Sequence, residues 1–90
     1  MKHDISRTTL MEQLLRRAAR ERRRVRVIYR HFGERGVTEH ERQWEPYAIR
    51  DGIVHVFSHF RDEFRRVPLA HIVNVEILRR SFEPRRPIET

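Results

Sequence analysis

Hydrophobic residues recur every three to four positions near the start of the chain, and at every second position further on. The first pattern forms one helical stripe, made up of Leu10, Met11, Leu14, Leu15 and Ala18. Thr9 followed by Glu12 has the spacing of a capping box, in which both side chains satisfy free backbone N–H groups. We therefore predict a helix over about residues 9–23, preceded by a flexible arm over residues 1–7.

From residue 25 the hydrophobic period is two, which is typical of β-strands. Turn residues separate the alternating stretches, among them the pair Asp51-Gly52. Pro46 indicates that the second strand bends there or follows an edge of the sheet. The predicted strands are residues 25–32, 38–49, 52–60, 64–69 and 71–78. One helix followed by five short strands predicts a mainly β fold, a small and strongly bent antiparallel barrel.

A chain of 90 residues has room for one domain, which we place at residues 8–80. The remaining residues, 81–90, contain Pro84 and Pro87 and are predicted to be extended or disordered. No apolar run reaches membrane-spanning length, the first ten residues lack a hydrophobic signal sequence, and there is no cysteine. The simplest expectation is a soluble cytoplasmic protein without membrane contact.

The chain carries a formal net charge of +7. Lys2 is its one lysine, so nineteen of its twenty basic residues are arginine. The planar guanidinium group suits phosphate and carboxylate recognition, so this composition favours an anionic partner. A GC-rich coding sequence would enrich arginine without selection for binding, and composition alone leaves both explanations open.

Three segments, taken in order, carry a resemblance to a known family. LLRRAARERRRVRVIY reads as a helix that leads into a strand ending in tyrosine, here Tyr29. The second segment, RQWEPYAIRDG, has an Arg–x–apolar–x–Pro pattern followed by a hairpin turn. The third segment, RRVPLAHI, corresponds to an Arg–x–Phe–Arg–Leu–Asp–Arg–Ile pattern, of which it keeps Arg65, Leu69 and Ile72. Residues from about 15 to 78 thus resemble a WYL domain, the SH3/Sm-like β-barrel module of bacterial transcription regulators. Val54, His55 and Val56 replace the Trp-Tyr-Leu triplet that names the family.

The resemblance implies a groove of basic and aromatic side chains for a nucleotide-like or single-stranded nucleic-acid ligand. Arg42 and Arg65 match the family pattern, while His55 and His71 stand where the family has Tyr and Arg. Regulators of this family carry a winged helix-turn-helix before the module. About two dozen residues precede the first predicted strand, too few for such a domain, so we expect a free-standing sensor module or binding subunit.

The histidines do not predict a metal site. His55 and His59 lie on the same face of one strand, but four residues of strand separate their Cα atoms by roughly 13 Å. Two nitrogens that bind one zinc ion lie within about 4 Å of each other, and no third ligand stands at suitable spacing. We expect neither a metal nor another cofactor.

The sequence likewise favours a protein that is not an enzyme. Ser58 lies within a strand without the glycine-flanked turn that exposes a nucleophile, and there is no glycine-rich phosphate loop. Strand alternation places Glu39, Glu41 and Glu45 on one face, which indicates a solvated surface rather than an acid–base pair. A nuclease with His55 or His59 as general base is the enzymatic alternative.

Arginines next to aromatic residues are typical of proteins that bind single-stranded nucleic acids, because bases stack while phosphates pair with guanidinium groups. We predict a non-enzymatic module that binds single-stranded nucleic acid or a phosphate-bearing small molecule. Phe57 faces the ligand if Val54, Val56 and Phe60 fill the core, whereas the opposite orientation buries it. The predicted ligand-binding residues are Arg42, His55, Phe57, His59, Arg65, Arg66 and His71.

The alternative function is protein–protein interaction or oligomerisation. A core this small favours self-association, and a homo-oligomer could form through the helix or through a strand edge. The module would then regulate a partner protein without a ligand of its own.

Overall fold

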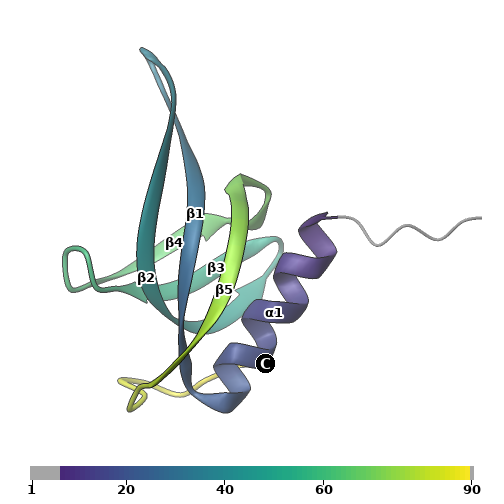
Figure 1. Ribbon diagram of the computed structural model, residues 1–90, viewed down its shortest axis with the longest axis vertical. Coiled ribbons are helices and arrows are strands. Elements are labelled where there is room, and N and C mark those ends of the chain that lie inside the picture. The colour runs from purple at the N-terminus through teal and green to yellow at the C-terminus, as the bar shows by residue number, and fades with distance from the viewer. Residues whose placement is uncertain (1–6, 90) are drawn as a thin grey trace, which may run out of the picture.

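The structure, a computed structural model, describes residues 7–89 as one helix and five strands in a single antiparallel sheet (Figure 1). The sheet order is β4-β3-β2-β1-β5. The fold class predicted from the sequence is confirmed. Residues 1–6 of the predicted arm lie outside the described residues. The elements are α1 (Arg7–Glu21), β1 (Arg23–Gly33), β2 (Gly36–Arg50), β3 (Ile53–Ser58), β4 (Glu63–Pro68), the 3-10 helix η1 (Leu69–His71) and β5 (Ile72–Ser81).

Helix α1 begins at Arg7, two residues earlier than predicted, so Thr9 is not its N-cap and the expected capping box is wrong. The Glu12 carboxylate instead accepts a hydrogen bond from Arg16 Nε at 3.0 Å. The helix ends at Glu21 because Arg22 has a left-handed backbone, with φ of 56°. Its buried side chains are Met11, Leu15, Ala18 and Ala19.

The sheet curls around one core, to which the helix and all strands contribute. Trp44 lies in this core, as do Val25 and Val27 of β1. β2 is the central strand, and its register against β3 shifts between Pro46 and Ala48. Pro46 therefore marks a bend and not a sheet edge. Its missing N–H is tolerated because the pairing of β2 with β1 extends only to Trp44.

Side chains of β3 alternate between the core and the outer face of the sheet. Val54 and Val56 are fully buried in the core, whereas His55 and Phe57 leave from the opposite face. The sequence left open whether Phe60 joins the two valines in the core, and it does not, since 56% of its surface is exposed. The reason is that β3 ends at Ser58 and a turn follows, so the strand alternation does not reach Phe60.

Residues 82–89, which we call the tail, contain neither helix nor strand and lie against the outer face of the sheet. Phe82 and Ile88 pack with Tyr47 and Phe57 in a second hydrophobic cluster. The Glu89 backbone N–H donates to the carbonyl oxygen of Tyr47 at 2.8 Å. Figure 1 shows the tail in yellow, crossing below the sheet and ending beside α1. The tail therefore covers part of the surface on which outward-facing residues of β2 and β3 lie.

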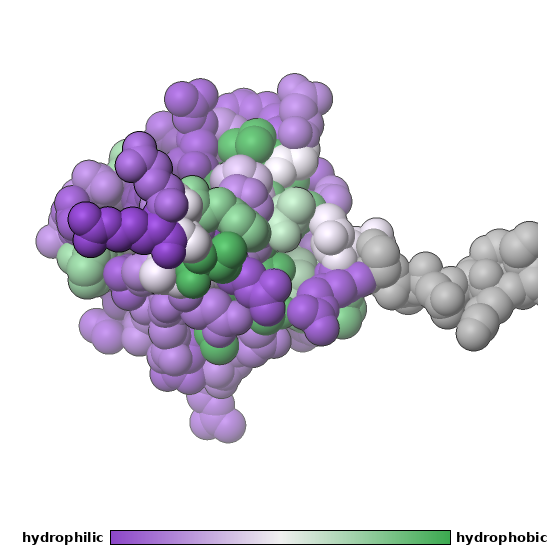
Figure 2. All heavy atoms as spheres, turned by 90° about the horizontal axis from the view of Figure 1, so that it is seen from above, coloured by the Kyte–Doolittle hydropathy of each residue, from purple (hydrophilic) through white to green (hydrophobic). Residues whose placement is uncertain are grey.

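At the opposite end, β1 and β2 project beyond the body of the sheet as a long hairpin (Figure 1). Phe32 and Val37 face each other in its register and are exposed. Figure 2 looks onto this end and shows a mostly hydrophilic surface with smaller hydrophobic patches. Within residues 7–89, no helix has the length and apolar character needed to cross a membrane.

Candidate anion-binding site

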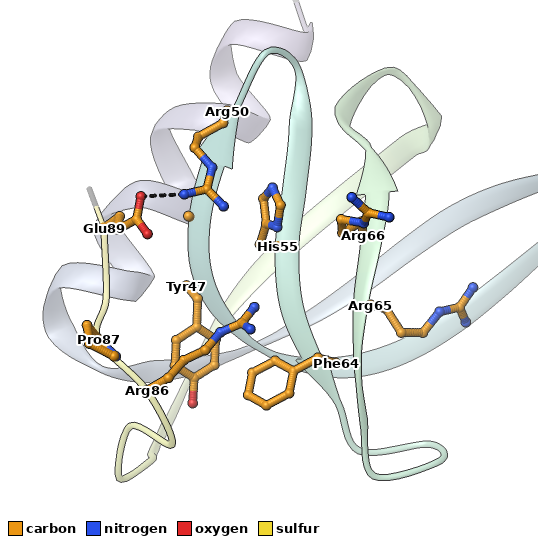
Figure 3. A pocket seen from close by; sticks show the side chains of 10 residues that line it. Tyr47, Arg50, His55, Phe64, Arg65, Arg66, Arg86, Pro87 and Glu89 are labelled. Carbon is orange, nitrogen blue, oxygen red and sulfur yellow. Dashed lines mark hydrogen bonds and ion pairs between the residues drawn. The ribbon is translucent and has the colours of Figure 1, made fainter.

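A cavity of about 410 Å³, which we call the tail pocket, opens on the outer face of the sheet between β2, β3, β4 and the tail (Figure 3). Strand alternation and the register of β3 with β4 bring His55 opposite Arg66 on this face. The tail supplies the remaining wall. The pocket is lined by Tyr47, Ala48, Arg50, His55, Phe64, Arg65, Arg66, Arg86, Pro87 and Glu89.

The tail pocket is strongly basic. Glu89 is the one carboxylate among its lining residues, and it accepts from Arg50 Nη1 at 2.7 Å. The other three lining arginines, Arg65, Arg66 and Arg86, form no ion pair within residues 7–89. Elsewhere on the surface some arginines are paired with glutamates, as in Arg26–Glu76 at 2.8 Å, while others, such as Arg79 and Arg80, form no ion pair within residues 7–89. The positive charge of Arg65, Arg66 and Arg86 is therefore not neutralised by a carboxylate within residues 7–89.

His55 lies between Arg50 and Arg66 (Figure 3). Burial lowers the pKa of His55 below its ordinary value, and the positive charges of Arg50, Arg66 and Arg86 lower it further, while Glu89 acts in the opposite direction. The imidazole is consequently neutral at pH 7. In this form it contributes one hydrogen-bond donor and one acceptor to the pocket.

Aromatic rings form the floor next to these charges. The Arg86 guanidinium lies over the Phe64 ring, 3.9 Å from its centroid, and Tyr47 meets the same ring edge-on with centroids 5.5 Å apart. Figure 3 shows Tyr47, Phe64 and Arg86 gathered at one end of the pocket. Rings and guanidinium planes are the surfaces on which nucleobases stack.

Beside the pocket, the tail neutralises a buried carboxylate. Glu45 is only 1% exposed, yet it belongs to the face expected to be solvated, so that expectation is wrong. Its Oε1 accepts from Tyr47 Oη at 2.9 Å and Arg85 Nε at 3.1 Å. Its Oε2 accepts from His59 Nε2 at 2.8 Å and Arg85 Nη2 at 3.2 Å. Four donors thus make the burial of this charge tolerable.

These contacts also set the charge state of Glu45. Burial alone would raise the pKa of its carboxyl, but hydrogen bonds from Arg85, Tyr47 and His59 outweigh burial, so the pKa lies below its ordinary value. Arg85 is held from a second side, because its guanidinium stacks on the Phe57 ring at 3.7 Å. The backbone N–H of Arg85 donates to Tyr47 Oη at 2.9 Å. Arg85 is thus the anchor that fixes the tail.

A second, shallower cavity of about 340 Å³ lies at the base of the β1–β2 hairpin, and we call it the hairpin pocket. The Arg42 guanidinium stacks on Phe60 here, 3.7 Å from the ring centroid. Arg65 pairs with Val56 in the strand register and thus leaves β4 on the core-facing side, the side on which Tyr29 and Arg42 also lie, so it points toward this pocket. The lining residues are Tyr29, His31, His40, Arg42, Phe60, Arg61, Glu63 and Arg65.

The residues predicted from the sequence to form one site are distributed over several surfaces. His55, Arg65 and Arg66 line the tail pocket, while Arg42 meets Arg65 only in the hairpin pocket. Phe57 and His59 face outward, but Arg85 and Glu45 of the buried network engage them. His71 lines neither pocket, and its ring lies 4.7 Å from that of Phe32. The tail residues Arg85, Arg86 and Glu89 were not predicted.

Within residues 7–89, no three histidine or acidic side chains are grouped closely enough to hold a metal ion. The Nε2 atom of His59 is hydrogen-bonded to Glu45. The chemistry of the site is therefore that of arginine, neutral imidazole and aromatic rings.

Known structures contain a similar fold. Proteasome accessory factor B/C (PafBC) of Arthrobacter aurescens matches with a TM-score of 0.72 and 20% sequence identity. The match covers 90% of this chain but 13% of the PafBC chain, so it concerns a small part of that protein and shows the fold. No curated protein matches the sequence significantly. The family model of the WYL domain matches residues 11–77, most of the chain, and the protein therefore belongs to the WYL domain family.

Proposed function

We propose that this chain is a non-catalytic regulatory module that binds a phosphate-bearing ligand of the nucleotide type in the tail pocket. The family assignment supports a regulatory ligand-binding module. The observation that supports this more specific proposal is the grouping of Arg50, Arg66 and Arg86 around a cavity that contains one carboxylate. Guanidinium groups bind phosphate oxygens through two parallel hydrogen bonds, and a partly enclosed pocket strengthens that attraction relative to water.

The aromatic rings in the tail pocket favour an anion that carries a base over a simple inorganic anion. A simple inorganic anion would use the arginines alone, whereas the Phe64 ring beside Arg86 offers a flat surface for a base. The cavity of about 410 Å³ falls within the usual range of small-ligand sites. A free nucleotide and a nucleotide within a single strand share this chemistry. They are distinguished by comparing ligands of increasing length.

The test is a binding titration with AMP, ADP and a fluorescein-labelled hexathymidylate at low salt. We expect saturable binding to the wild-type protein and an increase in its melting temperature, since a ligand specific for the folded state stabilises it. The double variant Arg66→Ala/Arg86→Ala should weaken binding at least tenfold, as two charge-assisted contacts are removed. Stronger binding of hexathymidylate than of ADP would identify a single-stranded nucleic acid as the ligand.

A matched control separates the pocket from overall charge. Arg79 and Arg80 are exposed on β5, at the other edge of the sheet, and line neither pocket. The double variant Arg79→Ala/Arg80→Ala changes the net charge by the same amount. We expect it to bind within about twofold of wild type. Equal losses in both double variants would show nonspecific attraction and refute the pocket.

One observation favours interaction as a second candidate function. Phe32 and Val37, paired at the projecting hairpin, are 56% and 54% exposed, and exposed apolar pairs on small domains often mark protein contacts. A homo-oligomer or a partner protein would then cover the hairpin. Sedimentation of the wild-type protein and of Phe32→Ser tests this idea. A concentration-dependent oligomer that the variant abolishes would support it, and a monomeric wild type would count against self-association.

A further inference from the structure

The last residue of the tail, Glu89, places its side-chain carboxylate in the basic tail pocket. Glu89 Oε1 lies 2.7 Å from Arg50 Nη1. In Figure 3, this pair lies on the same side of the pocket as His55. A carboxylate on arginine has the chemistry of a bound anionic ligand, here supplied by the chain itself.

The ion pair between Arg50 and Glu89 is weak because solvent surrounds it. The side chains of Arg50 and Glu89 are 54% and 59% exposed, and exposed ion pairs contribute little to stability. The neighbouring attachments are also modest, namely one backbone hydrogen bond from Glu89 to Tyr47 and the partly buried Ile88. The end of the tail can therefore leave the sheet at small cost.

The beginning of the tail is held differently. Arg85 makes two hydrogen bonds to a carboxylate that is 1% exposed and stacks on Phe57. Phe82 is buried against Tyr47, with ring centroids 5.6 Å apart. The tail thus consists of a firmly anchored part around residues 82–85 and a loosely attached end at residues 87–89.

A phosphate group would compete effectively for the position of Glu89. It offers more oxygen acceptors and more negative charge than a carboxylate. It could also use Arg66 and Arg86, which form no ion pair within residues 7–89. The neutral His55 ring beside Arg50 provides a further donor.

We propose that Glu89 is an internal competitor that occupies Arg50 in the ligand-free protein, and that the phosphate of the ligand displaces it and releases residues 87–89 from the sheet. The proposal rests on the proposed function, and it deepens it by assigning the ligand's anionic group to Arg50. It also makes the position of the tail end a readout of ligand binding.

The experiment compares Glu89→Gln with Glu83→Gln in titrations of labelled hexathymidylate. Glu83 is an exposed acid of the same tail and forms no ion pair within residues 7–89, so both variants remove one negative charge from the tail. We expect Glu89→Gln to bind about two- to fivefold more tightly than wild type, the range that an exposed ion pair can supply. Glu83→Gln removes the same charge without freeing Arg50, so its affinity should differ from that of wild type only by the smaller effect of net charge.

A second measurement follows the tail directly. The amide of Glu89, bonded to Tyr47, should exchange faster and change its NMR resonance at saturating hexathymidylate, while the Arg85 amide remains protected. If wild type binds and the two variants behave alike, or if the Glu89 amide is unchanged at saturation, the competition is refuted and the proposed function stands. If no variant binds hexathymidylate or ADP, both proposals are overturned.

Discussion

Arg85 donates from Nε and Nη2 to the two carboxylate oxygens of Glu45, at 3.1 and 3.2 Å, across forty residues of sequence. Glu45 projects from the central strand, and Arg85 belongs to a tail without regular secondary structure. This contact fixes the tail on the sheet and places the next residue, Arg86, over Phe64 in the tail pocket. The pocket therefore depends on a buried ion pair that lies beside it.

Replacement of Arg85 by alanine should destabilise the fold. Glu45 would remain buried with two of its four donors, so we expect the free energy of unfolding to fall by about 1–3 kcal/mol. Urea denaturation followed by tryptophan fluorescence measures the change, since Trp44 is buried in the core. Arg86→Ala is the matched control and should change stability by less than about 0.5 kcal/mol. Equal stabilities of the two variants would contradict the anchoring role of Arg85.

The same carboxyl predicts an acid-dependent stability. The folded state lowers the pKa of Glu45 below its ordinary value of 4.5, so the folded protein favours the ionised form. This contribution is fully present above pH 4.5 and is lost as the pH falls through the folded pKa. We expect Glu45→Gln to be less stable than wild type at pH 7, with the difference shrinking below pH 4.5. Denaturant titrations between pH 7 and pH 3 test this, and a difference that stays constant with pH would refute it.

The hydrophobic pattern predicted the helix and the five strands because each depends on local periodicity. Met11 and Leu15 recur at helical spacing, and Val54 and Val56 at strand spacing, and all four are buried in the core. Phe60 shows the limit of the pattern. The strand ends two residues before it, and no periodic signal marks that end.

The candidate site was harder to predict from the sequence than the fold, because tail residues form much of its wall. Glu45 shares strand parity with Glu39, which is exposed and pairs with Arg30, so parity indicated a solvated face. Only contact with a segment forty residues away buries Glu45. The arginines of that segment resemble any other basic run, since nothing in Arg85-Arg86-Pro87 shows that it returns to β2. His55 was among the predicted site residues because it occupies the centre of the family's naming triplet, and it lines the tail pocket.

Ligand binding should strengthen as the pH falls toward the range in which His55 takes up a proton. Burial and three arginines lower the pKa of His55, and a bound phosphate would raise it again, so the ligand prefers the protonated ring. Affinity should rise by up to about tenfold for each unit by which the ligand raises that pKa. Hexathymidylate without a terminal phosphate is a suitable probe between pH 7.5 and 5.5, because its phosphodiesters do not titrate there. His55→Gln should flatten the profile, and an unchanged profile would exclude His55 from the site.

Arg42 distinguishes the two cavities. It matches the family pattern but lines the hairpin pocket, where it stacks on Phe60. We expect Arg42→Ala to bind hexathymidylate within about twofold of wild type, since it contributes no contact in the tail pocket. Fluorescence anisotropy at fixed salt provides the comparison. A loss as large as that of Arg66→Ala would move the site to the hairpin pocket.

The salt dependence of hexathymidylate binding tests the central claim most directly, because it counts the phosphate contacts made by named arginines. For single strands, the slope of log affinity against log salt concentration is about −0.7 for each phosphate neutralised. Arg66→Ala/Arg86→Ala should therefore make the slope shallower by about 1.4, while Arg79→Ala/Arg80→Ala leaves it unchanged. Equal slopes in wild type and in Arg66→Ala/Arg86→Ala, or no measurable binding at low salt, would contradict anion recognition in the tail pocket.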